Sequence, residues 1–105
     1  MPKQFTEDQI AALLQDVEQL QKAYQVAFSG EAGALVLADL ARFCRAAEPC
    51  WSPDQRFHAL LEGRREVWLR IDAQRNLPPE DLLQRRVGDS YTVVKIEPED
   101  EDNAA

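Results

Sequence analysis

The stretch that decides the fold is residues 6–30, TEDQIAALLQDVEQLQKAYQVAFSG. Its apolar side chains recur at spacings of three and four, which is the repeat of one face of an α-helix. Thr6 and Gln9 have the spacing of a capping box, in which each side chain accepts a hydrogen bond from the other residue's backbone N–H. Ser29-Gly30 ends the pattern, because glycine readily adopts the left-handed conformation that follows many helices. The stretch predicts one amphipathic helix over about residues 7–28.

Two further long helices are predicted downstream. The helix expected at about 32–46 is apolar on more than one face, so it should be the central, most buried helix. Pro49 ends it, because the residue before a proline is pushed out of helical geometry. Ser52-Pro53-Asp54-Gln55 then predicts a helix start, with serine as the cap and proline at the first helical position. This third helix is expected to reach about Arg75, and Pro79 can start a short fourth helix.

The predicted fold class is all-α. Short connections between three amphipathic helices favour a small antiparallel three-helix bundle, to which a short fourth helix closed by Gly88 is added. Ser90 to Ile96 is rich in β-branched and aromatic residues and suits an extended strand, and the acidic residues 97–105 have no apolar anchor and are expected to be disordered. The sequence thus predicts a helical domain over 1–88 and an extended segment with an acidic tail over 89–105.

The charge is unevenly distributed along the chain. The formal net charge is −7, and Glu97, Glu99, Asp100, Glu101 and Asp102 supply five of the negative charges. The nearly balanced remainder argues against direct nucleic-acid binding, which needs a positive surface. The chain shows no charged-then-apolar leader and no apolar run of membrane-spanning length. We therefore expect no membrane attachment. We also expect the protein to be made in a reducing cytosol, where Cys44 and Cys50 should be free, mostly buried thiols.

The sequence carries no recognisable catalytic or metal-binding constellation. His58 has no nucleophile or carboxylate at a predictable spacing, and we interpret it as an exposed helix histidine. The two cysteines are six residues apart and lack the spacing of a zinc site. Gly30-Glu31-Ala32-Gly33 is not followed by lysine, so it predicts a turn and not a phosphate cradle. A non-enzymatic protein without cofactors is the expectation.

Two residues of the third helix are expected to organise the core. Gly63 borders the apolar face, where glycine costs about 1 kcal/mol relative to alanine, so it is predicted to let the second helix approach; the alternative is a glycine that is merely tolerated. Arg64 falls on the apolar stripe. It either pairs with Asp39, or secondarily with Glu48, or buries its stem while its guanidinium reaches water. The structural candidates are Gly33, Asp39, Gly63, Arg64 and Trp68.

Aromatic and arginine side chains are expected to form the surface that binds other proteins, because these residue types are enriched at binding hot spots. The strand predicted at Ser90–Ile96 could add to the edge of a partner's sheet. The acidic end would then favour a basic surface or keep the protein soluble. The interface candidates are Trp51, Arg65, Arg70, Tyr91, Val93, Val94 and Ile96.

Two stretches together resemble a known family. They are GALVLADLARFC at 33–44 and EGRREVWLRI at 62–71, and the Phe28-Ser29-Gly30 turn also fits. The chain resembles, over about residues 20–77, a small domain family of tailed bacteriophages named after the nineteenth gene of the Bordetella phage Bbp series. The resemblance implies a small phage structural or virion-associated component without catalytic residues.

The leading functional hypothesis is a non-enzymatic virion protein that docks onto other phage virion proteins. The resemblance implies a position near the portal, the tail or the internal proteins ejected with the DNA, where copies could form a symmetric ring. The protein is then expected in the virion after synthesis in the host cytoplasm. The alternative is a small phage regulatory or host-modulating protein that binds a basic host partner through its acidic tail.

Overall fold

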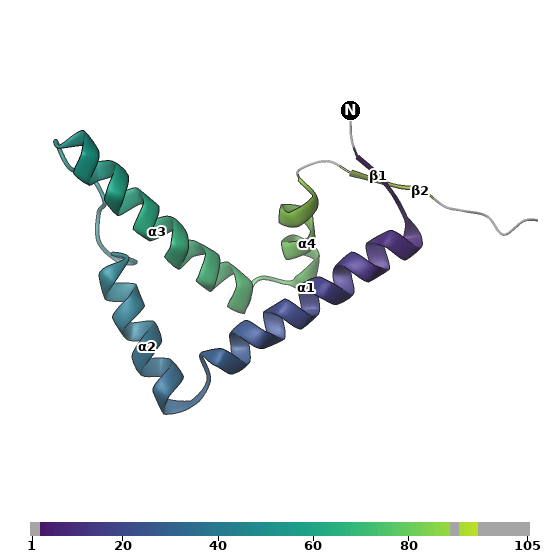
Figure 1. Cartoon of the computed structure of the whole chain (residues 1–105), viewed down its shortest axis with the longest axis horizontal. Coiled ribbons are helices and arrows are strands. Elements are labelled where there is room, and N and C mark those ends of the chain that lie inside the picture. The colour runs from purple at the N-terminus through teal and green to yellow at the C-terminus, as the bar shows by residue number, and fades with distance from the viewer. Residues whose placement is uncertain (1–2, 89–90, 95–105) are drawn as a thin grey trace, which may run out of the picture. The chain divides into compact units, whose positions relative to one another are not determined.

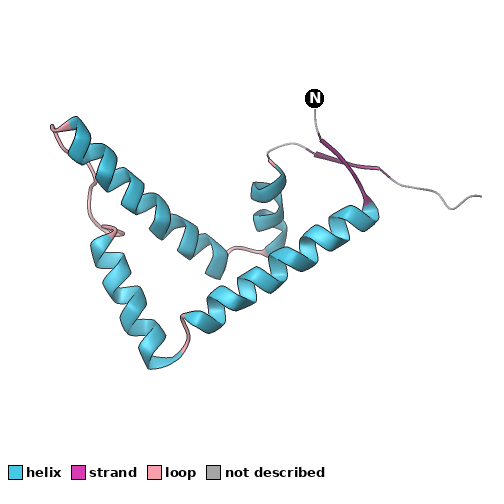
Figure 2. Cartoon of the chain, in the orientation of Figure 1, coloured by secondary structure: helices cyan, strands magenta, loops and turns pink. Residues whose placement is uncertain are grey.

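The computed structural model describes residues 3–88 and 91–94 of the chain, which are mostly helical (Figures 1 and 2). The elements are β1 (Lys3–Thr6), α1 (Glu7–Ala27), α2 (Gly30–Phe43), α3 (Gln55–Asn76), α4 (Pro79–Val87) and β2 (Tyr91–Val94). The mainly helical fold class is confirmed. The chain divides into a terminal unit, Met1–Glu18 with Pro78–Ala105, and a central unit, Gln19–Leu77.

The terminal unit contains a two-stranded parallel ribbon. β1 pairs with β2 so that Lys3 lies opposite Tyr91 and Thr6 lies opposite Val94. The strand predicted at 90–96 is therefore confirmed over its described part, but it pairs within the chain. Nothing in the sequence indicated the partner, because KQFT at residues 3–6 is a short, mostly polar stretch with little strand signal.

The two helix ends of the terminal unit follow the local sequence signals. The Thr6 N–H donates to Gln9 Oε1 (2.9 Å) and the Gln9 N–H donates to Thr6 Oγ1 (3.1 Å), so the predicted capping box starts α1. Pro79 starts α4, and Gly88 ends it with φ of 97°. The described core of this unit comprises Val17, Leu82, Leu83 and Val87, all buried.

In the central unit, a tight turn joins α1 to α2. Gly30 has φ of +72°, which confirms the predicted left-handed stop. Gly33 is buried, and a Cβ placed on it would collide with the backbone carbon and oxygen of Phe28. This contact is local, because Phe28 lies only five residues before Gly33 at the corner between α1 and α2. Only a residue without a side chain fits this corner.

α2 ends three residues earlier than predicted, in a Schellman motif. The Arg45 N–H donates to the Arg42 carbonyl (3.2 Å) and the Ala46 N–H donates to the Ala41 carbonyl (2.9 Å). Arg45 occupies the left-handed position of this motif with φ of 53°, where glycine is usual. A non-glycine residue there carries a strain of roughly 1–2 kcal/mol. The end of α2 was mispredicted because the residue at this position gave no signal.

The prediction that α2 is the most buried helix is wrong. Its Leu35 is 71% exposed and its Phe43 is 56% exposed, whereas Leu61 of α3 is 1% exposed. An apolar residue on every face predicts burial only if other segments cover every face, and the central unit leaves much of α2 uncovered. The buried residues of this unit among those described are Gly33, Cys44, Cys50, Leu61, Ile71 and Ala73.

α3 begins with a different cap from the one predicted. Asp54 accepts hydrogen bonds from the backbone N–H groups of Arg56 and Phe57, and the helix starts at Gln55. The predicted cap, Ser52, accepts instead from the Asp54 N–H (3.2 Å). The predicted start is therefore wrong by two residues, because serine and aspartate are comparable caps and the sequence offered both.

The C-terminal end of α3 returns to the second half of α1 within the central unit. Gln21 Nε2 donates to the Leu77 carbonyl (2.7 Å), and Gln25 Nε2 donates to the Arg75 carbonyl (3.1 Å). The two amides satisfy carbonyls that the last turn of a helix leaves without intrahelical partners. A complete antiparallel three-helix bundle stays a prediction.

Candidate protein-docking site

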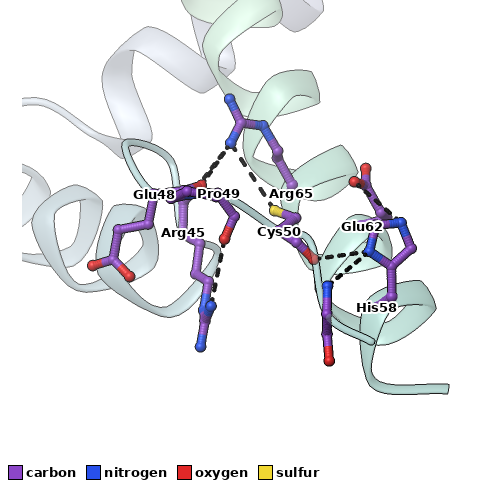
Figure 3. Close-up of polar contacts among 8 residues, drawn as sticks. Arg45, Glu48, Pro49, Cys50, His58, Glu62 and Arg65 are labelled. Atoms are coloured by element: carbon purple, nitrogen blue, oxygen red, sulfur yellow. Dashed lines mark hydrogen bonds and ion pairs between the residues drawn. The ribbon is translucent and has the colours of Figure 1, made fainter. Parts of the chain in front are cut away.

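The loop between α2 and α3, residues 44–54, is fastened to α3 by the side chain of Arg65 (Figure 3). Arg65 Nη1 donates to the Arg45 carbonyl (3.2 Å) and to the Glu48 carbonyl (3.0 Å), and it lies 4.0 Å from Cys50 Sγ. A guanidinium is suited to this task because it carries five N–H donors in a rigid fork. Arg65, an interface candidate by sequence, thus works as an internal anchor.

His58 holds the second half of the loop (Figure 3). Its Nδ1 lies 3.1 Å from the Cys50 carbonyl oxygen and 3.3 Å from the Ser52 nitrogen, and its Nε2 lies 3.9 Å from Glu62 Oε1. Nδ1 accepts from the Ser52 N–H when the proton is on Nε2, and it donates to the Cys50 carbonyl when it carries the proton itself. The interpretation of His58 as an exposed helix histidine is wrong, since the ring is half-buried against the loop.

Trp51 lies between the two backbone groups that His58 contacts. Its side chain is 73% exposed, whereas the preceding Cys50 is 6% exposed. The backbone is therefore anchored on both sides of Trp51 while the indole faces solvent. A large apolar side chain on an anchored loop loses little conformational freedom on binding, which favours its use as a docking anchor.

The two cysteines are the buried residues of the loop itself. Cys44 and Cys50 are both free and buried, as predicted. Cys44 also donates its backbone N–H to the Leu40 carbonyl (2.8 Å) at the end of α2. In the ranges 3–88 and 91–94, no group of three or more His, Cys, Asp or Glu residues could hold a metal ion. The buried side chains of Cys44 and Cys50 help to hold the loop in place.

Arg64 stacks on an aromatic ring and does not pair with Asp39. Its guanidinium carbon lies 4.2 Å from the centroid of the Phe43 ring, a cation–π contact that joins α3 to α2. Asp39 instead lies 3.7 Å from Arg42 on its own helix. The predicted Arg64–Asp39 pair is wrong, and among the described residues no ion pair joins Arg64 to the second candidate, Glu48. The structure favours the alternative without a carboxylate pair, in which Arg64 is half-buried.

The prediction that Gly63 lets α2 approach is also wrong. Gly63 is exposed, and a Cβ placed on it would have no neighbour within 4 Å. Arg70 is exposed on α3, and Trp68 is half-buried on the side of the helix that carries Leu61. Neither Gly63 nor Arg70 has a role inside the central unit.

The remaining interface candidates lie at the C-terminal end. Tyr91, Val93 and Val94 belong to β2, whose backbone pairs with β1. Ile96 lies outside the described residues. None of the described helices is long and apolar enough to cross a membrane. Of the seven candidates, the structure supports Trp51 and Arg70 as available side chains of the central unit.

A family model described as Bbp19-like phage protein matches residues 24–86, more than half of the chain. The chain belongs to this family. The Bbp19-like region runs from the second half of α1 into the last turn of α4; compared with the resemblance at 20–77, it begins four residues later and ends nine residues later. Searches of curated proteins and of solved structures found no match.

The anchored loop lies wholly inside the Bbp19-like region, together with both anchoring side chains, Arg65 and His58. The ribbon of β1 and β2 lies outside it. Neither His58 nor the Schellman turn at Arg45 was identified as a loop anchor from the sequence, because the acceptors are backbone carbonyls that leave no trace in residue types.

Proposed function

We propose that this Bbp19-like protein is a non-enzymatic virion component that docks onto other virion proteins through the loop at 44–54. The observation that carries the proposal is Trp51, 73% exposed between two backbone positions that contact His58. Membership of a phage protein family supports a role in a phage. Portal, tail and internal virion proteins are the partners proposed, and repeated copies could dock around a symmetric ring.

The physical case rests on the cost of ordering an interface. Tryptophan is among the residues most enriched at hot spots, where its truncation typically costs about 2 kcal/mol or more, equivalent to roughly a 30-fold change in affinity. Arg65 and His58 hold the loop before any partner arrives, so binding need not order it. The exposed indole therefore contributes to affinity with a small entropic penalty.

The decisive experiment compares phage particles that carry Trp51→Ala with particles that carry Leu69→Ala. Leu69 is a matched control, because it is 51% exposed on α3 but lies away from the loop. Quantitative mass spectrometry of purified particles should show Trp51→Ala depleted about tenfold or more and Leu69→Ala at the wild-type level. Circular dichroism of both purified variants checks that each folds.

Two results would count against the proposal. If the wild-type chain is absent from purified particles, the virion role is rejected. If it is present and Trp51→Ala is incorporated normally, the docking role of the loop is rejected while the virion role stands. A stoichiometric partner captured from uninfected host lysate at moderate salt would instead support the alternative of a host-modulating protein.

A further inference from the structure

α3 carries an exposed seam that nothing inside the central unit uses. Arg56, Leu60, Gly63, Val67 and Arg70 follow one another at spacings of four and three, which is the repeat of one side of a coiled-coil helix. All five residues are exposed. Leu61, buried at 1% exposure, falls outside these spacings, whereas the buried Ile71 follows Val67 by four residues and therefore borders the seam. We call these five residues the α3 seam.

The middle of the α3 seam is apolar and has a notch at Gly63, where no side chain projects. Leu60 is 48% exposed and Val67 is 54% exposed, and Gly63 lies between them with no neighbour for a Cβ within 4 Å. Glycine weakens a helix interior, and no close contact with the described part of the chain accounts for its presence here. A glycine between two apolar residues lets the backbone of a second helix come close to α3 while its side chains pack on Leu60 and Val67.

The two ends of the α3 seam are positive. Arg56 and Arg70 are fourteen residues apart, which corresponds to about 21 Å along the helix. Among the described residues, neither guanidinium has an ion-pair partner. A second copy of α3 would place arginine against arginine whether it ran parallel or antiparallel about Gly63, and like charges at an interface oppose association. The charges therefore favour a partner that is acidic at both ends.

We propose that the α3 seam binds an amphipathic helix of another protein. The partner helix has a small residue opposite Gly63, apolar residues beside Leu60 and Val67, and acidic residues that reach Arg56 and Arg70. Because both ends of the seam are positive, such a helix fits in either direction. This surface is separate from the Trp51 loop, so the proposal can be tested independently of the docking role proposed for that loop.

The test uses the full chain and a pair of synthetic probe helices of about 21 residues, matching the length of the seam. One peptide has an alanine centre, flanking leucines and two glutamates at each end, and the other has lysines in place of the glutamates. Fluorescence anisotropy is expected to show the glutamate peptide binding at least tenfold more tightly than the lysine peptide. Gly63→Leu should weaken that binding at least tenfold, because it fills the notch.

Two further variants separate charge from packing. The double variant Arg56→Glu with Arg70→Glu should prefer the lysine peptide, whereas Leu69→Ala, an exposed change off the seam, should bind like the wild type. Equal affinity for both peptides overturns the proposal, as does equal loss in Gly63→Leu and Leu69→Ala. A dimer of the chain in sedimentation that Gly63→Leu abolishes also overturns it, because the occupant would then be a second copy.

Discussion

The two glycines inside helices of the central unit should respond in opposite ways to alanine. Gly63 has open space around it, so Gly63→Ala adds only helix propensity and should stabilise the fold by about 1 kcal/mol. Gly33 faces the Phe28 backbone, which a new Cβ would strike. Overpacking costs typically about 1–3 kcal/mol or more, and backbone cannot swing aside as a side chain can. Because the clash is with backbone, we take the upper end of this range, about 3 kcal/mol; after subtracting the propensity gain of about 1 kcal/mol, we expect Gly33→Ala to destabilise by about 2 kcal/mol.

Thermal unfolding followed by far-UV circular dichroism measures both effects. In a domain of this size, 1 kcal/mol shifts the melting temperature by about 4–8 °C. Gly63→Ala should therefore melt about 4–8 °C higher than the wild type, and Gly33→Ala about 8–16 °C lower. Since both positions belong to the central unit, each variant reports on the same structure. The reasoning is refuted if Gly33→Ala melts at or above the wild-type temperature, or if Gly63→Ala melts below it.

Four further substitutions test the caps and the loop anchor. Asp54→Ala should lower the unfolding free energy by about 1 kcal/mol, and Ser52→Ala by clearly less, because Asp54 caps α3; denaturant unfolding that ranks them in reverse would contradict the structure. Thr6→Ala should cost about 1 kcal/mol by the same method through loss of the capping box, and an unchanged midpoint would argue against that box. Arg65→Met should speed amide hydrogen exchange across residues 45–52 by releasing two carbonyls, whereas unaltered exchange there would show that the loop does not depend on Arg65.

Helix ends were predictable where a short-range signal was strong. The capping box at Thr6, the glycine stop at Gly30 and the short helix closed by Gly88 all follow the predicted pattern. Each depends on residues within one turn of the chain, so no tertiary information is needed. The end of α2 was missed because Arg45 adopts a conformation that its residue type does not favour.

The candidate docking site was only partly predictable. Trp51 could be chosen from residue type, because aromatic side chains are enriched at binding hot spots. Its anchoring could not, since His58 and Arg65 act on backbone carbonyls of residues 45–50. Arg65 was expected to face a partner and instead faces its own loop. Residue type singled out Trp51 and Arg65 but not what they contact, and it gave no indication of the contacts that His58 makes with the loop.

The sequence by itself determined the helical character, the amphipathic α1, several helix ends and the phage family to which the chain belongs. These properties depend on the spacing of nearby residues, because helix periodicity and capping act over a few residues. The tertiary structure alone decided which apolar residues are covered, leaving Leu35, Leu60 and Val67 exposed while Leu61 is buried. Covering a face depends on where distant segments lie, and that is not a property of any short stretch.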